Sequence, residues 1–235
     1  MEVLAVKKIP FYRELAYPIG LAVLALGTAL MEKAAFGMSM VTAPAYIIWS
    51  KLVLSLPQLS FGTVSYLFEA ALLLLLMLLL RRFRLSYLLS FVTAVLFGLL
   101  LDACMALTGL LPYTIVARII YYVSGTVICS LGVALLFHTY FTPEAYELFV
   151  KEIARAKGME LGRCKTIYDC SSCGFALLLS FLLFGFGQFV GVGVGTILCA
   201  LVNGKLITLL SKALEKRFNF TDAIQNKRFR GFFAD

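Results

Sequence analysis

The sequence predicts an all-α membrane protein with six transmembrane helices, and three observations lead to this fold class. The first is composition: 61% of the 235 residues are hydrophobic and 14% are charged, whereas a soluble domain carries roughly 25% charged residues. The second is that the apolar residues form six runs close to the length of about 20 residues that crosses a bilayer as a helix. The third is that the runs are continuous, not alternating, which favours helices that satisfy their own backbone hydrogen bonds in lipid. The runs span residues 15–36, 61–80, 85–107, 113–138, 167–186 and 188–210.

Basic residues are distributed unevenly among the segments that join these runs. Most of the 21 Lys and Arg residues lie in the N-terminal tail, the turn after the second run, the segment after the fourth run and the C-terminal tail. If all six runs cross the membrane, these four segments share one side, which the positive-inside rule assigns to the cytoplasm. Both termini are therefore predicted to be cytoplasmic. The net charge of +8 is explained by this topology and by contact with the lipid bilayer, and it does not indicate nucleic-acid binding.

The two halves of the chain resemble each other. Three pairs of stretches or positions follow in the same order: LGTALMEKAAFG (26–37) with LGVALLFHTYFT (131–142), Thr63 with Thr166, and FGLLLDAC (97–104) with LCALVNGK (198–205). Chance similarity between Leu-rich helices would explain a single match, but the shared order favours an internal repeat. Because each repeat holds three spans, an odd number, the second copy would enter from the opposite side of the membrane. The sequence therefore predicts inverted repeats, as in many transporters.

The predicted units are residues 1–110, residues 111–212 and a basic cytoplasmic tail, 213–235. Each unit contains a shorter segment after its first helix. In the first unit this segment is 38–60, which is apolar and interrupted by prolines, and it is expected to be interfacial or re-entrant, with a plain loop as the alternative. In the second unit it is 142–162, where Thr-Pro-Glu predicts a helix N-cap and the following residues predict an amphipathic interfacial helix, with Lys151, Glu152 and Arg155 around its apolar face.

Ionisable residues inside the spans are candidates for a functional site, because they are costly in lipid and usually face the protein interior. Glu69 lies about 12 Å along the second run, near the bilayer centre, and Asp102 about 25 Å along the third, in its outer half. Glu32 lies at the outer end of the first run. Carboxyl groups within reach of one another suit proton coupling or cation binding. We therefore expect Glu32, Glu69 and Asp102, with Asn203 from the second half, to bind the substrate or protons; a purely structural Glu69 is the alternative.

Cys170 and Cys173 are three residues apart and share a helix face. With His138, the single histidine, they suggest a site for a soft metal. The alternative is that these thiols are small apolar packing residues. No nucleophile–base set is visible, so we expect neither an enzyme nor a cofactor.

The stretches LGTALMEKAAFGMSMVTAP, LSFGT and FGLLLDA resemble the bacterial integral membrane proteins of the YczE and YitT type. They cover much of the first half of the chain, whereas the second half fits weakly. The resemblance implies a multi-pass protein of the bacterial cytoplasmic (inner) membrane with six spans and a transporter-like role. It does not imply a particular substrate.

These features together predict a small secondary transporter with a substrate site between inverted repeats, and with protons or a cation as candidates for the coupling ion. Two alternatives stay open: a substrate-binding membrane subunit of an ATPase-driven importer, and a membrane partner or assembly protein that transports nothing. The expected partners are lipid and a small-molecule or ion substrate, and a homodimer is left open.

Overall fold

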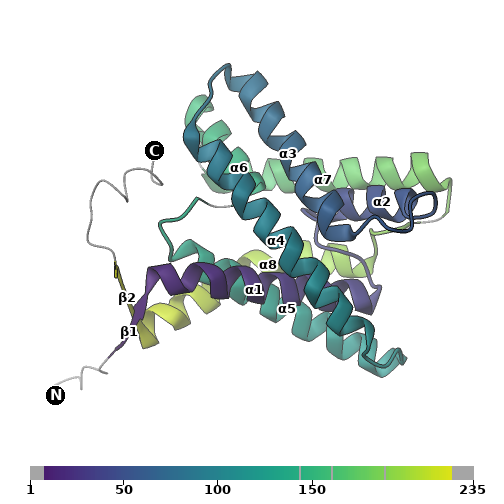
Figure 1. The fold of residues 1–235 in the computed structure, drawn as a ribbon, viewed down its shortest axis with the longest axis horizontal. Helices are drawn as coiled ribbons and strands as arrows, with labels where there is room; N and C mark the ends of the chain where they lie inside the picture. Colours follow the sequence, from purple (N-terminus) through teal and green to yellow (C-terminus); the bar gives the residue numbers. More distant parts are fainter. Residues whose placement is uncertain (1–7, 143, 160, 188, 224–235) are drawn as a thin grey trace.

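The computed structural model describes residues 8–142, 144–159, 161–187 and 189–223, and it is almost entirely helical (Figure 1). Six of its helices are long and apolar enough to cross a membrane, which confirms the predicted number of spans. In chain order the elements are β1 (Ile9–Tyr12), α1 (Arg13–Ala34), α2 (Ala43–Leu52), α3 (Phe61–Leu80), α4 (Leu85–Gly109), α5 (Ile115–Phe137), α6 (Ala145–Lys157), α7 (Leu161–Phe184), α8 (Val194–Arg217) and β2 (Phe218–Thr221).

The last two spans begin at residues that differ from the predicted ones. The fifth starts at Leu161, six residues early, because polar and charged residues form its first turns. The sixth starts at Val194 and continues to Arg217, into the segment predicted as a tail. The apolar residues before Val194 form a loop instead, since Gly185, Gly187 and Gly191 adopt positive φ angles that end helical structure. Of the rest of the predicted tail, residues 218–221 form β2, and residues 224–235 lie outside the described residues.

The core of the molecule is the antiparallel crossing of α1 and α5, which lie side by side over most of their length (Figure 1). Their backbones approach closely because glycines face the partner helix: Gly27 lies against Cys129 and Gly125, and Gly132 lies against Leu24. In lipid, where burial of apolar surface drives no association, such close packing is a main source of helix–helix stability. Helices α4 and α8 pack on opposite members of this pair, α4 on α1 and α8 on α5.

Both shorter segments contain a helix, so the plain-loop alternative for 38–60 is wrong. Helix α2 packs on α3 and α7, and α6 packs on α3, α4 and α7. The predicted start of α6 is also wrong: its N-cap is Glu144, not Thr142. Among the charged residues around its apolar face, Lys151 and Arg155 are exposed, whereas Glu152 is buried and accepts hydrogen bonds of 3.0 and 3.2 Å from the Arg84 guanidinium group.

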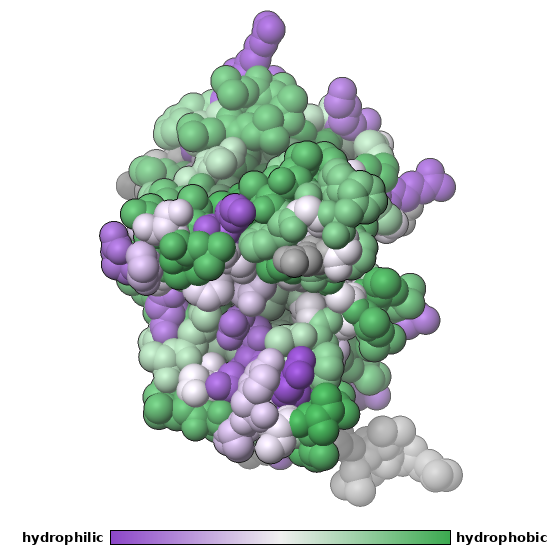
Figure 2. Space-filling view, turned by 90° about the vertical axis from the view of Figure 1, so that its right-hand side faces the viewer, coloured by the Kyte–Doolittle hydropathy of each residue, from purple (hydrophilic) through white to green (hydrophobic). Residues whose placement is uncertain are grey.

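The ends of the described chain form a feature that the sequence did not predict. Strands β1 and β2 pair in parallel, and the Glu14 carboxylate accepts hydrogen bonds from the Tyr140 hydroxyl group (2.8 Å) and the Ala223 amide (3.1 Å). We call the side of the bundle that carries β1 and β2 the strand face, and the opposite side, which carries the end of α1 and the loop between α7 and α8, the distal face (Figure 1). Figure 2 views the distal face, where hydrophilic residues gather between large hydrophobic areas.

Candidate functional site

A small pocket of about 50 Å³ lies where the two short helices begin, and we call it the central pocket. The loop before α2 and the residue that caps α6 both line it, together with parts of α1, α4, α5, α7 and α8. Its lining brings polar and charged side chains together from both halves of the chain: Ser39, Thr42, Glu144, Lys165, Asp169 and Asn203. A polar pocket at the ends of two short helices, surrounded by long apolar helices, is the best candidate for a binding site.

Glu144 is the most deeply buried carboxyl group of this pocket, with 6% of the residue exposed. Its Oε1 atom has no hydrogen-bond partner among the described residues. Burial raises the pKa of Glu144 well above its ordinary value of 4.5, and the nearby carboxyl groups of Glu69 and Glu147 raise it further, while Lys165 opposes them. A buried carboxyl group without a partner is costly as an anion, so Glu144 requires a proton or a bound cation.

Glu69, a predicted site residue on α3, lies beside this pocket. It is buried, and its Oε2 atom accepts a hydrogen bond of 3.4 Å from the backbone amide of Ala145, the first residue of α6. The carboxyl group therefore accepts a hydrogen bond from one of the backbone amides that have no partner within the helix at its start. Glu69 also contributes negative potential at Glu144.

The second half supplies the remaining charges of the pocket from one turn of α7. Lys165 and Asp169 are four residues apart and interact electrostatically. The Asp169 Oδ1 atom is buried and has no hydrogen-bond partner among the described residues. The Lys165 ammonium group lies 5.6 Å from the centre of the Tyr146 ring. Asn203, a predicted site residue, lines the pocket and accepts a hydrogen bond of 2.6 Å from the Ser130 hydroxyl group.

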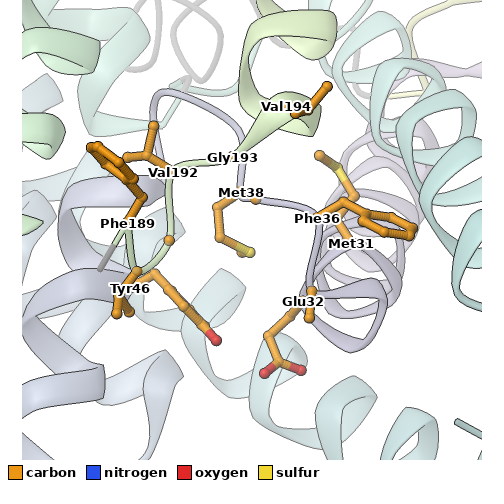
Figure 3. A pocket seen from close by; sticks show the side chains of 13 residues that line it. Met31, Glu32, Phe36, Met38, Tyr46, Phe189, Val192, Gly193 and Val194 are labelled. Carbon is orange, nitrogen blue, oxygen red and sulfur yellow. The ribbon is translucent and has the colours of Figure 1, made fainter. Parts of the chain in front are cut away.

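Glu32 lies elsewhere, in a larger cavity of about 410 Å³ at the distal face. Figure 3 shows the polar ends of Glu32 and Tyr46 directed toward each other, with Met38 between them and the loop before α8. Two backbone hydrogen bonds of 2.9 Å hold residues 36–38 against the segment around the start of α8. The Met38 amide donates to the Gly191 carbonyl oxygen, and the Gly195 amide donates to the Phe36 carbonyl oxygen. The structure therefore does not bring Glu32 together with Glu69.

Asp102 takes part in helix packing, in contrast to the expected shared site. Its Oδ1 atom accepts a hydrogen bond of 2.7 Å from the Gly62 amide, in the first turn of α3. Gly62 precedes Glu69 by seven residues, so this contact lies about 10 Å from Glu69 along the axis of α3. Asp102 thus acts as a cap for a neighbouring helix, a role that suits a carboxylate because helix starts carry partial positive charge.

The residues of the suggested metal site are not gathered into one. Cys170 is exposed and Cys173 is half-buried on α7. His138 lies just beyond the end of α5, where its Nε2 atom is 3.0 Å from the Ser211 hydroxyl group and its ring stacks on Phe220. Burial lowers the pKa of His138 below its ordinary value. Among the described residues, no group of three or more His, Cys, Asp and Glu side chains is placed to hold a metal ion.

Sequence reasoning did not assign Glu144, Lys165 or Asp169 to the site. A signal for the pocket was present, however, in the pattern Thr-x-x-Ala-Tyr, which occurs at 42–46 and again at 142–146. Both copies mark the start of a short helix, and both starts line the pocket. Comparing the linking segments as well as the spans would have located it.

No curated protein and no solved structure is significantly similar to this chain. A family model matches residues 11–212, which include the first five spans and most of α8. The match is compatible with the resemblance to YczE- and YitT-type proteins but does not establish it. Because it covers most of the chain, the chain belongs to DUF6198, a family of unknown function.

Proposed function

We propose that this protein is a small membrane transporter of the bacterial cytoplasmic membrane, with both termini in the cytoplasm and its substrate site in the central pocket. The pocket lies between two inverted units, residues 1–110 and 111–212, and each unit contributes one short helix that begins there. The observation that carries the proposal is this meeting of two helix starts at a polar pocket, an arrangement typical of transporters built from inverted repeats.

The contacts between α1 and α5 support the inverted repeat. When the stretches 26–37 and 131–142 are aligned, four glycine contacts between α1 and α5 form two pairs. Replacing both residues of one contact by their aligned counterparts gives the other contact of its pair. The exchanging contacts are Gly20–Leu136 with Met31–Gly125, and Gly27–Cys129 with Leu24–Gly132. This is the pattern that a two-fold axis through the crossing produces.

Contacts at the starts of the two short helices also support the inverted repeat. With Thr63 aligned to Thr166, Glu69 of α3 corresponds to Ser172 of α7. Glu69 accepts from the first amide of α6, and the Ser172 hydroxyl group donates to the Met40 carbonyl oxygen, 2.7 Å away, in the loop before α2. Corresponding residues of the two units thus touch the start of the other unit's short helix.

The proposal changes the set of site residues. Asn203 and Glu69 are kept, Glu144, Lys165 and Asp169 are added, and Asp102 is assigned to packing. Glu32 belongs to the distal cavity, which in this proposal is the approach to the central pocket from the outer side.

The test is transport by the full chain reconstituted in liposomes, measured electrically on a supported membrane against a panel of ions, amino acids and sugars. Ser39→Trp should fill the central pocket and abolish the response, whereas Leu78→Trp, at a position 75% exposed on the lipid-facing surface of α3, should retain it. A response that survives Ser39→Trp in folded protein would refute the proposed site. No response to any solute, combined with stable co-purification of an ATPase pair, would favour the importer subunit instead.

A further inference from the structure

The central pocket has unpaired acceptor atoms. Glu144 and Asp169 both line it, and their Oε1 and Oδ1 atoms, respectively, are buried and lack hydrogen-bond partners among the described residues. Buried polar atoms of this kind are almost always paired, so each requires a positive ion or a hydrogen-bond donor. The ligand that would complete the pocket is therefore a hydrogen-bond donor or a cation, and not a hydrogen-bond acceptor.

The helix starts at this pocket would attract an anion if their amides were unpaired, but several are already engaged. The Ala145 amide at the start of α6 donates to Glu69. At the start of α2, the Thr42 and Ala43 amides donate to the Ser39 carbonyl oxygen at 3.1 and 2.8 Å. A helix start binds an anion through free backbone amides. Because these amides are engaged, the acidic side chains determine the charge of the ligand that the pocket favours, which is positive.

The charges at the pocket leave one negative charge uncompensated. Glu144 and Asp169 are acidic and Lys165 is basic, and all three line it. The other charged groups that face Glu144, Glu69 on α3 and Glu147 on α6, are also acidic. A single monovalent cation would neutralise the three lining residues, and Glu69 and Glu147 add negative potential that favours a cation over an anion.

The size of the pocket points to the same kind of ligand. Its volume is about 50 Å³, and a cavity needs only about 10–15 Å³ by the same measure to hold one water molecule. The pocket therefore has room for an inorganic cation together with a few water molecules. Oxygen atoms suitable for a hard cation are present from both halves of the chain, including Asn203 Oδ1, whose second lone pair is free for coordination after the Ser130 bond.

We infer that the central pocket binds one monovalent inorganic cation between the carboxylates of Glu144 and Asp169, with Asn203 completing the oxygen ligands. The binding itself rests on the geometry of the pocket, whereas the role of the cation as transported or coupling ion rests on the proposed function. Because Glu144 is buried beside other carboxyl groups, protons compete with the cation for it, and binding weakens as the pH falls.

The test is a binding measurement on the purified full chain in detergent at mildly alkaline pH. NaCl, KCl or NH₄Cl replaces choline chloride at constant ionic strength, and thermal unfolding is recorded together with the fluorescence of Trp49, the single tryptophan, which lies on α2. At least one of the three cations should give a saturable rise in melting temperature. Glu144→Gln should weaken its apparent affinity at least tenfold, and Glu215→Gln, which removes an exposed carboxyl group on α8, should not change it.

Identical melting curves in choline and in all three cations would overturn the cation site, and so would full affinity in folded Glu144→Gln. If Glu144→Gln does not fold, Asp169→Asn and the loss of wild-type affinity at acid pH test the same site, and unchanged affinity in both would overturn it. Flux in liposomes separates the two proposals. Binding without flux of any solute would refute transport and leave the cation site standing, whereas flux that needs no cation, in protein that binds none, would refute the cation site alone.

Discussion

Replacing Gly27 by alanine tests the close crossing of α1 and α5 on which the whole arrangement depends. A Cβ atom at Gly27 would lie 2.5 Å from the Cys129 amide nitrogen and 2.8 Å from the Gly125 carbonyl oxygen. These neighbours are backbone atoms that cannot rotate away. The helices must therefore separate by about 1 Å to restore an ordinary contact distance.

The cost of this separation follows from the packing that it weakens. About 50 atom pairs at 0.1–0.2 kcal/mol each, losing a quarter to a half of their attraction, amount to about 1–5 kcal/mol. Alanine has a higher helix propensity than glycine, which offsets up to about 1 kcal/mol of this loss of stability. We expect a net destabilisation of about 1–3 kcal/mol, the usual range for overpacking, which lowers the melting temperature by about 2–12 °C in a chain of this size.

The assay is thermal unfolding in detergent, with Gly204→Ala as the matched control. Gly204 lies on α8, where a Cβ atom would meet nothing within 4 Å, so this variant should melt at or slightly above the wild-type temperature. Gly132→Ala should behave like Gly27→Ala, because its Cβ atom would lie 2.6 Å from the Leu24 amide nitrogen. If Gly27→Ala melts as high as Gly204→Ala, the described crossing is incorrect.

Three further predictions concern charged residues. Arg84→Ala leaves the buried Glu152 without its ion-pair partner and should cost about 3 kcal/mol in thermal unfolding; adding Glu152→Gln should recover part of the loss, and no recovery would contradict a charge effect. Because the pKa of Glu144 is raised in the fold, its contribution to stability is fully present below its ordinary value of 4.5 and is lost as the pH rises through the raised pKa. Melting temperatures in choline should therefore fall over that range, and Glu144→Gln should flatten the curve; an unchanged slope would contradict the assignment. Asp102→Asn should keep the contact with Gly62 and normal transport, whereas Asp102→Ala should destabilise by about 1 kcal/mol, and loss of transport in stable Asp102→Asn would restore its predicted role.

The spans could be predicted from the sequence because the bilayer imposes one requirement on all of them, a length of apolar residues with internal backbone hydrogen bonds. Their ends were harder to predict, since apolar residues also form loops when glycines adopt positive φ, as between Gly185 and Val194. The pairing of β1 and β2 was not predicted because it joins residues more than 200 positions apart, and four-residue strands carry too little periodicity to be recognised.

The site could be predicted only in part, for a related reason. Depth along a helix follows from the 1.5 Å rise per residue, and it was enough to single out Glu69, which lies beside the start of α6. The direction in which a side chain points depends on how helices pack. Glu32 faces the distal cavity, whereas Asp102 faces the start of α3. The sequence of a single helix does not indicate either contact. Glu144 was not assigned because it lies outside the spans in sequence, although α6 begins beside the buried Glu69.

The two units of the proposed repeat differ in how closely their last two helices approach each other, and this difference bears on how the proposed transporter would open. In the first unit α3 and α4 touch through Gly62 and Gly98, and a Cβ atom on Gly62 would collide with the Gly98 carbonyl group. The proposed repeat places Lys165 and Cys199 at the corresponding positions of α7 and α8, and side chains there prevent an equally close approach. Helices α7 and α8 pack mainly on other elements within the described part of the chain, and the glycine-containing loop that joins them borders the distal cavity. In the proposed transporter, the first unit would therefore be the more rigid one, and α7 and α8 would be the helices whose movement opens the central pocket toward the distal face.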